Sequence, residues 1–253
     1  EPPDLVIERL QAAGIRAIPT GLAHGTVTAL IGEQKFEITA LRHDVETDGR
    51  RAKVRFTDDW EADAARRDFT INAMSCTRNG DIYDPFGGLE DLGHGRVCFV
   101  GIARERIAED TLRLLRFFRF YAIFGRPPAD IEALLACRDM APNLAQLSGE
   151  RIRDEFFRIL LAPQAAEIVG LMRGERVIEH LLPEVRADNV GRLRLMAWLE
   201  TNAMRVTSVA ADPIRRLASL IVTDADGGNR IADRLKLSNH QRDRLLTIIS
   251  APF

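Results

Sequence analysis

The stretch AEDTLRLLRFFRF, from Ala108 to Phe120, mixes charged and apolar residues in a way that could do chemistry. Its charged residues recur at three- and four-residue intervals, which would place them along one face of a continuous helix. These residues are Glu109, Asp110, Arg113, Arg116 and Arg119. The ordinary alternative is a solvated stripe with ion pairs inside the helix. The many apolar residues among the charges argue against it, because they leave little of this helix to water.

Asp110 and Arg113 together could read the edge of a nucleobase. An ionised aspartate only accepts hydrogen bonds and an arginine only donates them. The exocyclic amines of cytosine and adenine are donors, and the ring nitrogen beside each amine is an acceptor. Uracil and guanine present the reverse order, and each unsatisfied buried group would cost about 1–3 kcal/mol. The pair is therefore predicted to accept C and A and to refuse U and G.

The sequence ARRDFTINA, which begins at residue 65, is a second candidate site. Asp68 is placed to cap a following helix, and this structural role alone would account for it. Arg66 and Arg67 would lie beside exposed backbone N–H groups at the start of that helix, an arrangement that suits a triphosphate. Asn72 would lie one turn further on, near enough to help.

Three other stretches are weaker candidates. Glu37 lies on the polar face of a predicted strand and could bind a metal, although a single strand carboxylate is usually a surface residue. The segment Asp84–Leu92, DPFGGLEDL, is mostly explained by turn chemistry. His43 and Asp44 resemble the core of a phosphohydrolase signature that no other histidine completes. The sequence lacks a Gly-rich phosphate loop with lysine, a Gly-x-Ser-x-Gly motif and a Cys/His nucleophile arrangement.

Alternating hydrophobicity predicts a β-hairpin that would position Glu37. Apolar residues occupy every second position in Gly25–Ile31 and Lys35–Leu41, on either side of a turn at Gly32. A short helix is predicted before the hairpin, over Asp4–Ala13. The polar segment His43–Asp58 after it predicts a mobile loop or ribbon.

Helical spacing dominates the rest of the chain. Short helices are predicted over Asp58–Arg66 and Phe69–Met74, a last strand over Val97–Val100, and one long helix over Ala103–Phe124. From Pro128 to Pro252 the spacing is helical, with proline and glycine punctuation and no convincing strand.

Composition excludes several classes of protein. With 253 residues, 46% hydrophobic and 28% charged, the chain is not a disordered tail, a collagen-like repeat or a disulfide scaffold. A net charge of −2 gives no overall basic field, so any site for a polyanion must be local. The scattered cysteines Cys76, Cys98 and Cys137 argue against a zinc site and indicate a cytoplasmic location. Neither a membrane span nor a signal peptide is predicted.

Six stretches, taken in order, resemble a known family. They are HGTVTALI, EITALRHDVETDGRRAKVRF, DDWEADAARRDFTINAMS, DPFGGLEDL, ERIAEDTLRLLRFFRF and LSGERIRDEFFRILL. Together they resemble the bacterial tRNA nucleotidyltransferase/poly(A) polymerase family, in the second class of its superfamily. The resemblance covers Leu5 to Pro183, and the remainder fits the family's helical body only in general character.

The resemblance implies an α+β fold in three parts. Residues 1–100 would form the remnant of a polymerase-β-like nucleotidyltransferase sheet domain, the head. Residues 101–162 would form a helical neck that carries the nucleotide template, and residues 163–253 a helical body that binds tRNA.

The resemblance also implies roles for individual residues. Arg67 and Asp68 resemble the positions that contact triphosphate and ribose, and Asn72 belongs to the same motif. Asp110 and Arg113 resemble the amino-acid template that pairs with incoming CTP or ATP.

Further roles follow from the same family. Glu109 completes the template pattern, and Arg116 and Arg119 resemble companions that hold the nucleotide phosphates. The ribbon around Asp48–Arg50 resembles the flexible loop that helps switch from C to A addition. The helix Gly149–Arg158 resembles one that steadies the neck.

The activity implied is template-independent addition of C and A to the 3′ end of tRNA, from CTP and ATP, with release of pyrophosphate. Two Mg²⁺ ions would lower the barrier to attack by the tRNA 3′-OH on the α-phosphate. A poly(A) polymerase that extends RNA with ATP is the close alternative, and a non-catalytic nucleotide- or RNA-binding fragment is the second. The expected partners are tRNA, ATP and CTP, with no membrane and no inferable protein partner.

The sequence departs from the family pattern at the metal site. The family's Asp-x-Asp pair and its Gly-Gly-x-x-Arg-Asp phosphate loop lie just before a segment like Glu1–Leu10, where this chain begins. Glu37 resembles the third, catalytic carboxylate. We therefore expect these residues to bind a nucleotide but not to hold two catalytic metals. We also expect the natural protein to carry a further N-terminal portion and more helical body after Phe253.

Overall fold

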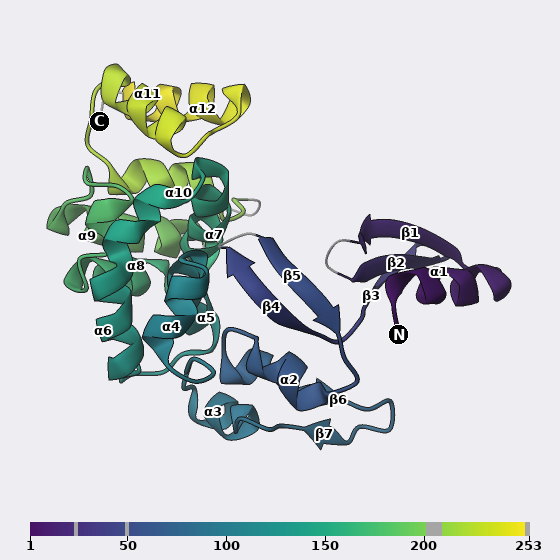
Figure 1. The fold of residues 1–253 in the computed structure, drawn as a ribbon. Coiled ribbons are helices and arrows are strands. Elements are labelled where there is room, and N and C mark those ends of the chain that lie inside the picture. The colour runs from purple at the N-terminus through teal and green to yellow at the C-terminus, as the bar shows by residue number, and fades with distance from the viewer. Residues whose placement is uncertain (23–24, 49–50, 201–208, 251–253) are drawn as a thin grey trace. The chain divides into compact units, whose positions relative to one another are not determined.

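The chain divides into two compact units of different secondary structure. The computed structural model describes the backbone of residues 1–22, 25–48, 51–200 and 209–250 and, outside residues 43–54, their side chains. The first unit, Glu1–Leu89, contains all of the named strands, and the second, Glu90–Phe253, is helical (Figure 1). The predicted α+β class is confirmed. The finer division into head, neck and body stays a prediction.

The N-terminal unit is built from short helices and antiparallel strands. Its elements are α1 (Pro3–Ala12), β1 (Arg16–Gly21), β2 (Thr26–Ile31), β3 (Gln34–Thr39), β4 (Arg42–Asp48), β5 (Arg51–Phe56), α2 (Trp60–Ala65), the 3₁₀ helix η2 (Thr70–Asn72), β6 (Ser75–Cys76) and β7 (Ile82–Tyr83). A further helix, α3 (Gly88–His94), begins at its end, where the Asp84 carboxylate accepts hydrogen bonds from the backbone N–H groups of Gly88 and Leu89 at 2.7 and 2.9 Å.

The hairpin predicted from alternation is confirmed. β2 and β3 pair antiparallel, with Val27 opposite Ile38 and Ala29 opposite Phe36. Val27 and Ala29 are buried, whereas Glu37, on the opposite face of the sheet, is exposed. The prediction omits β1, which pairs with β2 at the edge of this sheet. Its sequence contains Pro19, which is compatible with an edge strand but breaks the alternating pattern.

The polar segment after this sheet is an antiparallel hairpin. β4 and β5 pair from Arg42–Phe56 to Asp48–Arg51, so the loop alternative is wrong and a two-stranded ribbon is formed. The ladder uses backbone groups, which every sequence supplies, so a polar sequence can form it without an apolar alternation. Residues 49–50 of the segment predicted to switch between C and A addition lie outside the described residues.

The C-terminal unit confirms the helical prediction for the second half of the chain. Among its described residues β structure is limited to isolated bridge residues, such as the pair Val185 and Ile221. None of the described helices has both the length and the apolar character needed to cross a bilayer. Its elements are α4 (Ala103–Glu109), α5 (Leu112–Phe124), α6 (Ile131–Met140), η3 (Ala141–Gln146), α7 (Gly149–Leu161), α8 (Ala165–Gly174), η4 (Ile178–His180), α9 (Ala187–Trp198), α10 (Pro213–Leu220), α11 (Ala225–Arg234) and α12 (Asn239–Ser250).

The single long helix predicted over Ala103–Phe124 is wrong, because the chain breaks at Asp110. Its backbone is extended, with φ −150° and ψ 105°, and it separates α4 from α5. Oδ1 of Asp110 accepts a hydrogen bond from the backbone N–H of Leu112 at 3.1 Å. An aspartate side chain that bonds a nearby backbone N–H in this way favours a helix start over a helix interior.

The strand predicted over Val97–Val100 is also wrong. The segment forms no strand, although Phe99 is an isolated bridge residue, and Val97, Phe99 and Val100 are buried. The ring of Phe99 stacks on that of Phe117, with centroids 5.9 Å apart. A short apolar run indicates burial, but its periodicity does not separate a strand from a buried connection.

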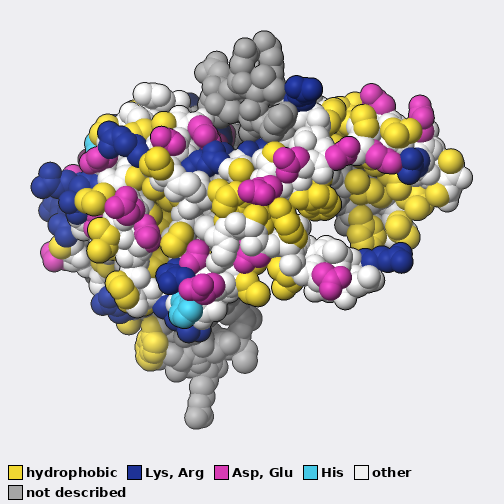
Figure 2. Space-filling view, turned by 60° about the horizontal axis from the view of Figure 1, so that its bottom comes forward, with side chains coloured by type: hydrophobic (Ala, Val, Ile, Leu, Met, Phe, Trp, Pro, Cys, Tyr) yellow, Lys and Arg dark blue, Asp and Glu magenta, His cyan; other side chains and the backbone are white. Residues whose placement is uncertain are grey.

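Charges of both signs are mixed on the face of the molecule shown in Figure 2. On this face (Figure 2), acidic and basic side chains lie among one another and among hydrophobic ones. Exposed pairs such as Arg104–Asp139 and Arg194–Glu167 neutralise charge locally. An anion site must therefore be formed by a few basic side chains that lie close together, as the net charge of −2 predicts.

Candidate functional site

In the N-terminal unit, one buried carboxylate holds two arginines. Asp63 lies on α2, and its side chain is 4% exposed. Oδ1 accepts hydrogen bonds from Nε and Nη2 of Arg66 at 3.0 and 2.6 Å, and Oδ2 accepts from Nε and Nη2 of Arg67 at 3.3 and 3.1 Å. The two guanidinium groups are thereby fixed on the two oxygens of one side chain.

Asp68 and Asn72 join this group, which we call the Asp63 cluster (Asp63, Arg66, Arg67, Asp68 and Asn72). Oδ1 of buried Asp68 accepts a hydrogen bond from the side-chain amide Nδ2 of Asn72 at 2.9 Å. Nη1 of Arg67 donates to the backbone carbonyl of Asn72 at 3.0 Å. The predicted helix-cap role of Asp68 is wrong, because η2 begins at Thr70 and has no side-chain cap. The structure instead brings together Arg67, Asp68 and Asn72, as one hydrogen-bonded group.

Asp63 itself is not among the site residues predicted from the sequence. Its signal is the spacing Asp-x-x-Arg-Arg, which on a helix brings the carboxylate to both arginines at i+3 and i+4. Burial raises the pKa of Asp63, but hydrogen bonds from the Arg66 guanidinium and the Arg42 backbone N–H outweigh burial. The pKa of Asp63 therefore lies below the usual range for aspartate.

A lowered pKa gives a signed prediction for stability against pH. The Asp63 carboxylate stabilises the fold above the pKa it has when unfolded, about 4, and this stabilisation is lost as the pH falls through the lower folded pKa. We expect Asp63→Asn to flatten the fall in unfolding free energy between about pH 5 and pH 2, measured by urea denaturation. The control is Asp58→Asn, at a nearby exposed carboxylate. Equal slopes for wild type and Asp63→Asn would contradict the prediction.

In the C-terminal unit, Glu109 lies between two arginines. Its Oε2 is 2.7 Å from Nη1 of Arg106 and 2.5 Å from Nη1 of Arg113. Nη1 of Arg113 also donates to the Arg106 carbonyl at 3.2 Å. The side chains of both arginines are 15% exposed, so Arg106 and Arg113 are both largely enclosed.

Asp110 has a different partner. Its Oδ2 accepts from Nη2 of Arg151, on α7, at 2.8 Å, and both side chains are about a quarter exposed, at 24% and 26%. The predicted stacking of Asp110 with Arg113 along one helical face is wrong, because Asp110 lies before α5 and not within it. The structure nevertheless keeps the two residues close, since the Arg113 backbone N–H donates to the Asp110 carbonyl at 2.9 Å.

Further along α5, two arginines flank one aromatic ring. The guanidinium carbons of Arg116 and Arg119 lie 5.5 and 4.9 Å from the centroid of Phe120. Nε of Arg119 is also 3.1 Å from Oε2 of buried Glu155, on α7. Arg119 therefore joins α5 to α7, and the predicted phosphate contacts of both arginines stay predictions.

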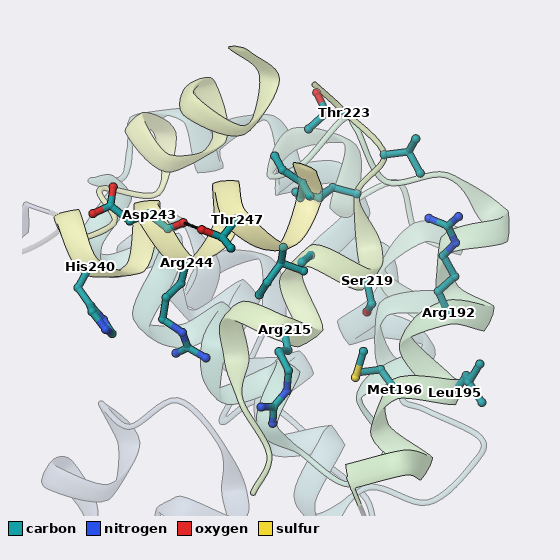
Figure 3. Close-up of a pocket in the computed structure, with 15 residues that line it drawn as sticks. Arg192, Leu195, Met196, Arg215, Ser219, Thr223, His240, Asp243, Arg244 and Thr247 are labelled. Carbon is teal, nitrogen blue, oxygen red and sulfur yellow. Dashed lines mark hydrogen bonds between the residues drawn. The ribbon is translucent and has the colours of Figure 1, made fainter. Parts of the chain in front are cut away.

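One described cavity of the C-terminal unit is lined by none of these residues. It has a volume of about 1040 Å³ and lies among α9, α10 and α12 (Figure 3). Leu195, Met196 and Ile248 contribute to a mainly apolar lining, with Arg192 and Arg244 among its charged groups. No candidate residue from the sequence analysis lines it.

Comparison with known proteins decides the family. Residues 2–98 match the family described as "Poly A polymerase head domain", and residues 130–188 match "Probable RNA and SrmB- binding site of polymerase A". The mitochondrial CCA tRNA nucleotidyltransferase 1 of Mus musculus is 40% identical over 250 residues, 98% of this chain and 56% of that protein. The chain belongs to the tRNA nucleotidyltransferase/poly(A) polymerase family. The predicted resemblance is confirmed.

Other members of the nucleotidyltransferase family agree. The CCA-adding enzyme of Streptococcus gordonii is 34% identical over 248 residues, 92% of this chain and 60% of that protein. The crystal structure of the Bacillus stearothermophilus CCA-adding enzyme in complex with CTP has a TM-score of 0.74 and 30% identity, covering 93% of this chain and 56% of that one. The chain thus spans about half the length of the curated relatives it matches.

The described residues do not form the metal site that this nucleotidyltransferase family implies. Family members generally depend on a divalent metal. The described residues contain no group of three or more His, Cys, Asp or Glu side chains placed to hold a metal ion. Glu37 is exposed on β3, and Mg²⁺ is usually bound by one or two carboxylates together with waters and substrate phosphates. Its role as a catalytic or metal-binding carboxylate stays a prediction.

Proposed function

We propose that this chain acts in the template-independent addition of C and A to the 3′ end of tRNA, from CTP and ATP, with release of pyrophosphate. One observation carries the proposal: an acceptor-only side chain, Asp110, and a donor-only side chain, Arg113, lie at the start of α5. Each has an opposite charge as its partner, and each is partly open to solvent. The names of the relatives support the same activity.

The selection step follows from hydrogen-bond direction. The Asp110 carboxylate would accept from the exocyclic amine of cytosine or adenine, and the Arg113 guanidinium would donate to the neighbouring ring nitrogen. Glu109 orients Arg113 by binding one of its amino groups. UTP and GTP would place a carbonyl against Asp110 and an N–H against Arg113, so both contacts would be lost.

The Asp63 cluster would bind the parts that all nucleotides share. Arg67, with a side chain 37% exposed, would donate to triphosphate oxygens, while Asp68 and Asn72 would lie near the ribose. Arg66, at 19%, is more enclosed and mainly holds Asp63. Arg116 and Arg119 are proposed as further phosphate contacts in the C-terminal unit.

Substitution of Arg67 is expected to weaken the binding of all four nucleotides alike. Loss of a charge-assisted hydrogen bond to phosphate should reduce affinity about tenfold without changing the order of preference. Equilibrium dialysis of CTP, ATP, UTP and GTP with Arg67→Ala measures this, with exposed Arg78→Ala as the control. A change confined to some of the bases would contradict the assignment of Arg67 to the phosphates.

The proposed reaction is attack by the tRNA 3′-OH on the α-phosphate, with pyrophosphate as the leaving group. We propose Mg²⁺ as the cofactor on the basis of the family. When bound, it would neutralise charge on the leaving group. None of the selection contacts above involves the metal.

Incorporation on a tRNA that lacks its 3′ end tests this proposal against two others. The protein as the cell produces it should add C, C and A in that order from mixed CTP and ATP. Runs of A without C would support a poly(A) polymerase, the alternative favoured by the description of the family that matches residues 2–98. Nucleotide binding without any incorporation would support a non-catalytic binding role.

We propose a cytoplasmic location for this protein. Cys76, Cys98 and Cys137 are all free thiols, which suits a reducing compartment. The mitochondrial relatives represent the alternative, and fractionation of cells that produce the protein distinguishes the two locations.

A further inference from the structure

Asp110 depends on a neighbouring helix for its orientation. It lies in extended backbone between α4 and α5, so helical packing does not fix its side chain. Two hydrogen bonds do: Oδ1 accepts from Leu112 N–H at 3.1 Å, and Oδ2 accepts from Nη2 of Arg151 at 2.8 Å. Arg151 is 41 residues further along the chain and belongs to α7.

Arg151 is presented by a firmly held helix start. It is the third residue of α7, whose N-cap Ser148 accepts the Arg151 backbone N–H at 3.5 Å. Gly149 fits closely against the rest of the C-terminal unit, since a Cβ there would lie 2.2 Å from the Arg234 carbonyl oxygen. The Arg119–Glu155 pair joins α7 to α5 along the same contact. The guanidinium of Arg151 is thus brought to Asp110 from a fixed position.

An aspartate and an arginine that both face one base can also pair with each other. That ion pair would compete with binding of the base. Arg113 is close enough to Asp110 for a backbone hydrogen bond of 2.9 Å. A direct ion pair between the two side chains would use the acceptor and the donor that the base requires. In the structure each has a separate counter-charge, Arg151 for Asp110 and Glu109 for Arg113.

We propose that Arg151 is a positioning residue for base selection, which fixes the Asp110 carboxylate by an ion pair of its own and so prevents a direct side-chain pair between Asp110 and Arg113. The inference rests on the proposed function, because it gives a further specificity residue for the same site. This positioning role of Arg151 requires a positive charge at residue 151 and a hydrogen-bond acceptor at residue 110. A merely structural arginine would affect stability or the affinity for all nucleotides alike.

The test compares three variants in nucleotide binding. Arg151→Met removes the charge but keeps a long side chain, Arg151→Lys restores the charge, and Arg158→Met is a control on the same helix, at a side chain 59% exposed. Equilibrium dialysis gives the dissociation constants for CTP, ATP, UTP and GTP, and urea denaturation gives the stability of each protein. We expect Arg151→Met to lower the preference for CTP and ATP about tenfold, Arg151→Lys to restore part of it, and the control to keep it.

A double variant shows whether Arg151 acts through Asp110. If it does, adding Arg151→Met to Asp110→Ala should cause no further loss of preference. An unchanged preference in Arg151→Met, or equal and additive losses in the double variant, would overturn the inference while the proposed function stands. A wild-type protein that binds all four nucleotides equally would overturn both.

Discussion

Replacing Asp110 with alanine is expected to abolish most of the discrimination between CTP or ATP and UTP or GTP. In the proposed site the Asp110 carboxylate accepts a hydrogen bond from the base amine. Without it, the carbonyl of UTP or GTP would no longer face another hydrogen-bond acceptor. The ratio of the dissociation constants for UTP or GTP to those for CTP or ATP should fall about tenfold or more. The reason is that one or two unfavourable polar contacts of UTP and GTP are removed. Equilibrium dialysis of the four nucleotides measures it. Arg113 should behave in the same way, because it supplies the other half of the pattern.

The Asp110 substitution also has a local structural effect that must be separated from selectivity. The carboxylate accepts the Leu112 N–H at the start of α5, and loss of such a contact costs about 1 kcal/mol. Asp110→Asn keeps an acceptor for this N–H while it removes the charge, and Asp139→Ala removes an exposed carboxylate of the same unit. Unchanged selectivity in a folded Asp110→Ala protein would defeat the template assignment.

The largest expected loss of stability comes from Glu200→Gln. The Glu200 side chain is 1% exposed, with Oε1 2.9 Å from Nη2 of Arg215 and Oε2 2.6 Å from Nε of Arg216. Arg216 is itself buried and donates to the carbonyls of Leu160 and Ala162. Loss of the carboxylate charge would leave buried guanidinium charge uncompensated, which costs about 3–5 kcal/mol. The melting temperature should therefore fall by about 10 °C, measured by calorimetry.

A matched control for Glu200 is available within the same unit. Glu167 pairs with Arg194 at 3.0 Å, but both side chains are more than half exposed. Glu167→Gln should cost less than about 1 kcal/mol, because solvent screens an exposed pair. A loss for Glu200→Gln no greater than that for Glu167→Gln would show that burial does not set the strength of the Glu200 pairs.

Local periodicity was sufficient to predict the elements that depend on one face of side chains. The β2–β3 hairpin follows from alternation on each side of Gly32, where φ is +61°. The donor and acceptor chemistry of Asp110 and Arg113 also follows from residue type alone.

Contacts between distant residues could not be predicted in this way. The partner of Asp110 is Arg151, which no spacing rule connects to it. The helix break at Asp110 depends on one side-chain hydrogen bond, whereas the pattern of apolar residues runs on without interruption. For Asp63 the i+3 and i+4 spacing to Arg66 and Arg67 is local, but the burial of its carboxylate is not set by that spacing.

A structure of this protein with bound CTP is the most direct test of the account. We predict that the cytosine amine lies about 3 Å from the Asp110 carboxylate and that the neighbouring ring nitrogen accepts from Arg113. In the same structure Arg151 should still bind Oδ2 of Asp110. A cytosine whose pairing edge faces solvent or other side chains, with Asp110 and Arg113 paired to each other, would contradict the account.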